Sequence, residues 1–386
     1  MKVSGPMLCT KKELKIAGCY TNRMNVVEVS IVMQVIVTIK SFEEKAAELN
    51  YLIPAIKATM ESVVNRLIVL ESPPINTDNL VAIHFTENYR EELFEFQESV
   101  GHPKFATQNK IGDGYAQVVY VDEGQGPNEI QGYHIFINKL IPMAIMVSQL
   151  CENLAEIHET TDTEQLEIVK YSKREKNKYL RMIRHELAHV EDGNNQAKWS
   201  WLKSALDEDT IESVLRGDAF HLWKEYYACC RSNFFYDVDT TTEEVTALLS
   251  NLEEAEAEIC DLRWKYNTRR IALHEFVKLF HEYIRLAFTY CCYFMGHTDV
   301  IYEYVKEKLH PELHPSRFYK YVGQMWEVLR AMAASYPNWK SSDIFDDLSA
   351  VILKSIEDFE IYPEDTEQGV YYYIPPKKLL TKSKEN

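Results

Sequence analysis

The chain of 386 residues is long enough to bury a sizeable hydrophobic core, and its length predicts two or three domains. Its formal net charge of −17 argues against nonspecific binding to nucleic acid or to an anionic membrane, because such binding needs a basic surface. No apolar run approaches the ~20 residues that span a bilayer, and no signal-peptide pattern opens the sequence, so we expect a cytoplasmic protein.

Cysteine usage predicts free thiols rather than a disulfide framework. The 8 cysteines show no Cys-x-x-Cys spacing, and four of them form the adjacent pairs Cys229-Cys230 and Cys291-Cys292. Adjacent cysteines rarely bridge each other or form a finger-type zinc site. We therefore expect mostly buried, free thiols in a reducing compartment.

The first 240 residues predict an arm followed by a domain with a small sheet. Residues 1–45 are interpreted as an N-terminal arm, and apolar positions after it predict one or two helices that break near Pro54. Runs rich in Val, Ile and aromatic residues predict strands over residues 80–85, 116–122 and 133–138. We expect a mostly antiparallel sheet within a domain of residues 46–240.

The most informative motif is His185-Glu186-Leu187-Ala188-His189, a His-Glu-x-x-His pattern. Two histidines four residues apart on a helix lie roughly 6 Å apart along its axis, so both imidazoles can reach one metal ion. The glutamate after the first histidine points to an adjacent sector, where it can take a proton from a metal-bound water. The motif therefore predicts a zinc site with Glu186 as general base.

A capping box and a glycine predict the limits of the motif helix. Ser172 and Glu175 have the spacing of a capping box, and Gly193 marks an expected end. The motif helix has an apolar face made of Tyr179, Ile183, Leu187 and Val190. Both histidines lie on another side of the helix.

Catalytic zinc normally takes three protein ligands, so another donor must join the two histidines. An extended motif would have a glycine three residues and a histidine six residues after His189. These positions hold Asp192 and Asn195, so a nearby third histidine ligand is excluded. A helix that Asp218 could cap carries His221 and Glu225 on one face, and either side chain could supply the donor. We favour Glu225.

The His-Glu-x-x-His motif followed by Trp223-Lys224-Glu225-Tyr226-Tyr227-Ala228 resembles gluzincin-type, zincin-like metallopeptidases, including uncharacterised bacterial ones. The resemblance covers about residues 45–240. It implies His185, His189 and Glu225 as zinc ligands, Glu186 as base and proton shuttle, and an edge strand that binds the substrate backbone. A protein or peptide substrate follows from the same resemblance.

Two parts of the site stay open at this stage. The thermolysin-like subset has an aspartate four residues after its ligand glutamate to orient the first histidine, whereas this chain has Cys229. Asp192, Asp237 or Asp239 could take that role instead. The oxyanion of a tetrahedral intermediate also needs a donor, and the candidates on the Glu225 helix are Tyr226, Tyr227 and His221.

Helical patterns dominate the chain after residue 240. Thr241 and Glu244 form a second capping box. An alternating three-four spacing follows at Val245, Leu248, Leu252, Ala255, Ile259, Leu262 and Tyr266. This seam packs either within the chain or in helix-mediated self-association. The expected fold class is α+β, with a mainly helical domain over residues 241–376 and a solvated tail over residues 377–386.

Two other functions compete with the metallopeptidase. In a di-iron carboxylate protein, Glu186 and His189 would form one Glu-x-x-His arm and Glu307 and His310 the other. In a non-catalytic scaffold the heptad seam would bind a partner helix, and the histidines would be incidental. The segment between the ligand helices, which contains Trp199 and Trp201, either helps to select substrate or anchors a loop to the core.

Overall fold

The computed structural model describes residues 34–38, 52–106, 108–109, 112–113, 115–122, 130–157, 163–206, 209–235, 241–306, 316–367 and 369–375. The described residues all belong to the compact unit that begins at Gln34. Most of the expected arm, the tail, Asp237, Asp239, Glu307 and His310 lie outside these ranges.

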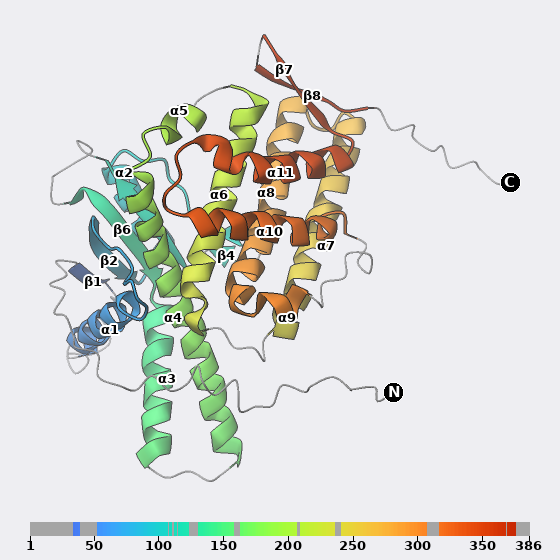
Figure 1. The fold of residues 1–386 in the computed structure, drawn as a ribbon. Coiled ribbons are helices and arrows are strands. Elements are labelled where there is room, and N and C mark those ends of the chain that lie inside the picture. Colours follow the sequence, from blue (N-terminus) through green and yellow to red (C-terminus); the bar gives the residue numbers. More distant parts are fainter. Residues whose placement is uncertain are drawn as a thin grey trace, which may run out of the picture. The chain divides into compact units, whose positions relative to one another are not determined.

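Before the second ligand helix, strands and helices alternate at first, and a run of strands and then a run of helices follow (Figure 1). They are β1 Gln34–Thr38, α1 Leu52–Ile68, β2 Leu80–Thr86, α2 Tyr89–Ser99, β3 Gln108–Asn109, β4 Gly112–Asp113, β5 Ala116–Val121, β6 Gly132–Asn138, α3 Leu140–Ile157, α4 Thr163–Gln196 and α5 Leu202–Leu206. The remaining elements are α6 Ile211–Ser232, α7 Thr241–Asn267, α8 Leu273–Thr298, α9 Tyr302–Lys306, α10 Tyr319–Ser335, α11 Asp346–Asp358, β7 Tyr362–Thr366 and β8 Gly369–Tyr373. Helices predominate and are accompanied by small sheets, so the broad α+β class is confirmed.

The main sheet has the strand order β1-β2-β6-β5. β1 pairs with β2 and β2 with β6 in parallel, and only β5 pairs antiparallel, with β6. The expectation of a mostly antiparallel sheet was wrong, although the three expected strands are present. Helix α1 connects β1 to β2, and a helical crossover of this kind returns the chain to a parallel neighbour. The strand at residues 34–38 falls within the part of the chain that was expected to form an arm.

The motif helix α4 is longer than its sequence signals predict. Ser172 does not begin it but lies in its interior, where the Ser172 carbonyl accepts a hydrogen bond from the Ser148 hydroxyl of α3. Ser172 and Glu175 are also compatible with the interior of a helix, and packing against α3 extends α4 beyond them toward its N-terminus. Gly193 lies in the last turn, and a Cβ atom there would collide with the Tyr133 ring of β6. Glycine thus allows α4 to lie close to the sheet.

Helix α6 also begins earlier than expected. Its N-cap is Thr210, whose side chain accepts a hydrogen bond from the Ser213 amide at 3.2 Å. Asp218, the expected cap, lies inside the helix and is buried, where it accepts a hydrogen bond from Arg285 of α8 at 2.9 Å. Asp218 therefore forms an ion pair with a neighbouring helix and does not cap α6.

Helices α6, α7, α8, α10 and α11 pack together on the other side of α4 from the sheet (Figure 1). The α7 seam is buried within the chain and packs against α8 through Leu248, Leu252, Ala255, Ile259 and Leu262. The hairpin of β7 and β8 follows these helices and was not expected. The domain boundary near residue 240 stays a prediction.

Candidate metal centre

Three side chains from two helices converge at the His-Glu-x-x-His motif. His185 and His189 lie one turn apart on α4, and Glu225 faces them from α6. The Nε2 atoms of the two histidines are 3.0 Å apart, and the Glu225 carboxylate oxygens lie 3.5 Å from His185 Nε2 and 3.8 Å from His189 Nε2. One potential ligand atom from each residue lies within 4.8 Å of the others. The structure thus brings together the three ligands expected from the sequence.

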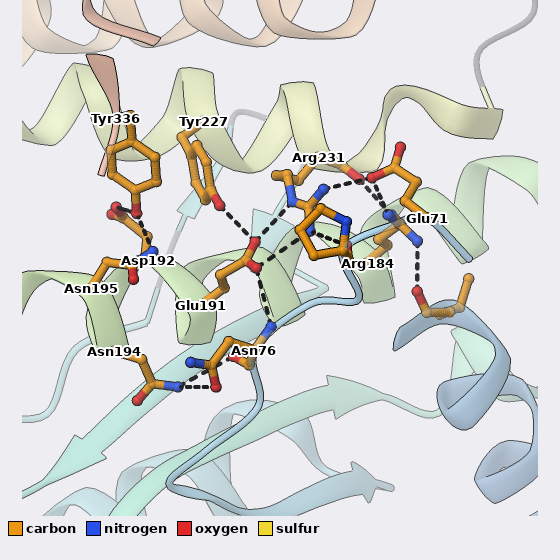
Figure 2. A network of polar contacts seen from close by, with 12 residues as sticks. Glu71, Asn76, Arg184, Glu191, Asp192, Asn194, Asn195, Tyr227, Arg231 and Tyr336 are labelled. Carbon is orange, nitrogen blue, oxygen red and sulfur yellow. Dashed lines mark hydrogen bonds and ion pairs between the residues drawn. The ribbon is translucent and has the colours of Figure 1, made fainter. Parts of the chain in front are cut away.

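A partly buried ionic network holds the two ligand helices together (Figure 2). Arg184 of α4 has no exposed surface, and it donates to Leu67 O at 2.6 Å, to Glu71 at 2.6 Å and to Arg231 O of α6. Arg231 in turn donates to Glu71 at 2.7 Å and to Glu191 of α4 at 2.8 Å. Because Arg184 directly precedes His185, these contacts fix the helix at the motif.

The network continues along α4 toward its end (Figure 2). Glu191 accepts a hydrogen bond from the Tyr227 hydroxyl at 2.6 Å. One helical position further, the buried Asp192 accepts one from the Tyr336 hydroxyl at 2.8 Å. Asp192 is therefore engaged beside the site and is not the partner of His185.

Burial and neighbouring charges set the protonation of the three ligand side chains. Burial lowers the pKa of His189 to about 3, so its imidazole is neutral. Burial alone would raise the pKa of Glu225, but the adjacent histidines hold it well below its ordinary value. Burial opposes the charging of His185, whereas Cys229 and Glu225 raise its pKa well above the ordinary value. Glu225 thus presents a carboxylate, the form that ligates a metal.

Glu186 differs from Glu225 in its environment. Burial is the main cause that raises the pKa of Glu186, to about 7; Glu225 adds to the rise and His185 opposes it. A carboxyl group with a pKa near the working pH can both accept and release a proton. Glu186 therefore has the properties expected of a general base, beside the ligands and not among them.

Cys229 contacts the outer nitrogen of His185. Its Sγ atom lies 3.5 Å from His185 Nδ1, and it follows Glu225 by one turn of α6. The thiol thus occupies the place that an orienting aspartate would take in the thermolysin-like subset, a role that the sequence left open. His189 has no such support among the described residues, because its Nδ1 atom is buried there without a hydrogen-bond partner.

Tyr293 of α8 was missed by the sequence reading. Its ring lies edge-on to that of His185, with centroids 6.1 Å apart, and its hydroxyl is within hydrogen-bonding reach of Glu225. Burial and the neighbouring Glu225 raise its pKa well above the ordinary value, so the hydroxyl keeps its proton. No motif marks this position, because only the packing of α8 on α6 brings it to the site.

Two of the three candidate oxyanion donors of α6 form hydrogen bonds away from the ligand group. The Tyr226 hydroxyl donates to Asp299 at 3.0 Å and the Tyr227 hydroxyl to Glu191, so both are engaged in other networks. His221 stays on the face of Glu225, with its Nε2 atom 3.3 Å from the Thr289 hydroxyl of α8. Of these three residues, His221 alone remains next to the ligand group.

Trp199 and Trp201 stack on each other with ring centroids 5.6 Å apart. The Trp199 indole donates to Pro337 O at 3.1 Å, and the ring is buried in the helical core. These contacts are those of an anchor between the segment after α4 and the core.

No protein-family model, no curated protein and no solved structure matches the chain. Among the described residues, no helix is both long and apolar enough to cross a membrane.

Proposed function

We propose that the chain is a zinc-dependent metallopeptidase of the gluzincin type, acting on a protein or peptide. The observation that carries the proposal is the convergence of His185, His189 and Glu225 from two separate helices, with the half-buried Glu186 beside them. A helix with two incidental histidines would not require a carboxylate from a second helix to face both imidazoles.

The donor set fits zinc. Two imidazoles and one carboxylate are a ligand combination of catalytic zinc sites that leave a position for water or substrate. The Cys229 contact at Nδ1 leaves Nε2 of His185 turned toward Glu225. When bound, zinc would supply a Lewis acid that polarises a carbonyl and makes water a better nucleophile at neutral pH.

The side chains around the ligands then have distinct roles in the proposed reaction. Glu186 accepts the proton of the attacking water and delivers it to the leaving amine, consistent with its pKa of about 7. Tyr293, which keeps its proton, donates a hydrogen bond to the carbonyl oxygen as negative charge develops there. Cys229 holds the ring of His185 in orientation.

The Glu186→Gln variant tests the role of the base. We expect it to retain zinc and to lose hydrolysis of a mixed peptide library, measured by mass spectrometry of the products. Glu167→Gln, on the exposed part of the same helix, is the matched control and should keep both properties. Loss of zinc in Glu186→Gln would make this residue a ligand and contradict the proposed role.

The third ligand is tested by a pair of alanine variants. Glu225→Ala should weaken zinc binding much more than His221→Ala, because only the first removes one of the three converging donors. The opposite ranking would assign the donor to His221. Iron near two ions per chain would instead favour the di-iron reading, and a chain that binds no metal would favour the scaffold.

A further inference from the structure

A lysine without an ion pair lies beside the candidate metal centre. Lys224 directly precedes the ligand Glu225 on α6, and its side chain is half-buried. Its Nζ atom lies 5.6 Å from the centroid of the Phe220 ring, and the ammonium group forms no ion pair or hydrogen bond with any described residue. A charge that is partly removed from water gains free energy when an opposite charge binds to it. The position is therefore favourable for an anion.

Lys224 differs in this respect from other cations of the helices around the site. Several of these are paired with carboxylates inside the chain: Arg181 with Glu244, Arg231 with Glu71 and Arg285 with Asp218. The chain has 59 acidic and 42 basic side chains, so a shortage of carboxylates does not explain the unpaired lysine.

The ammonium group of Lys224 lies near two imidazoles. Burial is the main cause that lowers the pKa of His189 and of His221, and the positive charge of Lys224 lowers both further. Such an effect requires the charge to be close to both rings. The Thr289 hydroxyl contacts Nε2 of His221 at 3.3 Å, which leaves Nδ1 of this ring for another partner. Lys224 and His221, three residues apart on α6, can thus both donate hydrogen bonds next to the ligand group.

Two carboxylates close to Lys224 are engaged with other groups. Glu225 faces the two ligand histidines. Burial raises the pKa of Asp192 and Lys224 lowers it, so these two charges interact across space. Asp192 nevertheless accepts hydrogen bonds from Tyr336 and Gln196, and forms no ion pair with Lys224. Within the described part of the chain, the anion that would complete the position is thus not supplied.

We propose that Lys224 and His221 bind a carboxylate group of the substrate, near the bond that is cleaved. This inference rests on the proposed function. In a peptide the carboxylate is either the C-terminal group or the side chain of an aspartate or glutamate. Both accept hydrogen bonds from an ammonium group and from an imidazole N–H. Lys224 thus selects among substrates, whereas the ligands and Glu186 perform the reaction.

Binding of intact peptides to the zinc-loaded Glu186→Gln chain tests the site, because this variant is expected to leave peptides uncleaved. Two pairs of fluorescent peptides are compared by anisotropy, one with a free or an amidated C-terminus and one with an internal Glu or Gln. We expect one carboxylate peptide to bind about 10-fold more tightly than its neutral counterpart, and that pair identifies the source of the carboxylate. Equal binding within both pairs, or no binding at all, would overturn the proposal.

Substitutions in the same background test the residues. Lys224→Met should abolish the preference for the carboxylate, whereas Lys224→Arg should keep most of it. His221→Gln should reduce the preference by less, because a neutral donor forms a weaker hydrogen bond with a carboxylate than an ammonium group does. Lys203→Met, at an exposed position of α5, is the matched control and should keep the preference unchanged. A preference that survives Lys224→Met at equal zinc content would overturn the assignment.

Failure of this inference can be told apart from failure of the proposed function. A wild-type chain that hydrolyses carboxylate and neutral peptides with equal kcat/KM would contradict the carboxylate site alone. A chain that binds carboxylate peptides through Lys224 and hydrolyses none of them would support the site and contradict the hydrolase.

Discussion

Replacing Gly296 by alanine tests how closely α8 must approach the second ligand helix. A Cβ atom at Gly296 would lie 2.7 Å from Tyr226 O and 3.1 Å from Cys230 N, and closer still to Cys229 Cβ. Ordinary contacts of this kind begin near 3.4 Å, so α8 must move away from α6 by about 0.7 Å or more. The movement would disturb the α6 turn that follows Glu225, and also Tyr293, which lies one turn before Gly296.

The expected cost can be separated from the intrinsic helix preference of alanine. Overpacking of a close-packed interior costs about 1–3 kcal/mol, whereas glycine to alanine in an open helix position gains roughly 0.5–1 kcal/mol. Gly217→Ala in α6 and Gly323→Ala in α10 are matched controls, because a Cβ atom at either position meets nothing within 4 Å. Urea unfolding should therefore show both controls to be as stable as the wild type or more so, and Gly296→Ala to be less stable. A Gly296→Ala protein as stable as the controls would refute the close approach.

Four further substitutions separate catalysis, orientation and stability. Tyr293→Phe should lower the rate of peptide hydrolysis by about 100-fold while zinc content stays unchanged; a rate equal to that of the wild type would remove the hydroxyl from the proposed reaction. Cys229→Ala should weaken zinc affinity by about 10-fold and Cys230→Ala much less, as measured by competition with a chelating dye; equal losses would argue against the contact with His185. Arg184→Met should destabilise the fold by about 2–4 kcal/mol in urea unfolding, because it leaves the Leu67 and Arg231 carbonyl oxygens without their donor, while Glu71 keeps its ion pair with Arg231; a loss below about 1 kcal/mol would contradict this. Burial raises the pKa of Asp192 to about 6, so the folded state binds a proton more tightly than the unfolded chain does. The free energy of unfolding should therefore fall by about 2–3 kcal/mol as pH rises from 4 to 6. Urea unfolding should show that Asp192→Asn removes this loss, and parallel pH profiles for the variant and the wild type would contradict the cause.

The sequence predicts the parts of the fold that depend on local pattern. Alternating apolar residues locate β2, β5 and β6, and the helical spacing around the motif locates the buried face of α4. The spacing of the two histidines is likewise a local property, because one turn of helix places both rings on one side. Glu225 could be proposed because its own helix also has a readable pattern.

The features that the sequence misses depend on contacts between distant segments. The residue pattern of a strand does not distinguish parallel from antiparallel pairing. A mostly antiparallel sheet was expected, whereas the helical crossover through α1 makes β1 and β2 parallel. Ser172 and Asp218 resemble helix caps but lie inside helices, one beside α3 and the other paired with Arg285. Tyr293 reaches the site only because α8 packs against α6, and no spacing within the sequence reports that contact.

The central claim is that His185, His189 and Glu225 bind one zinc ion. The most direct measurement is the zinc content of the purified wild-type chain and of Glu225→Ala after dialysis against a weak chelator, by inductively coupled plasma mass spectrometry. We expect about one zinc per wild-type chain and almost none in the variant. A wild-type chain without zinc, or a Glu225→Ala chain that keeps it, would contradict the account.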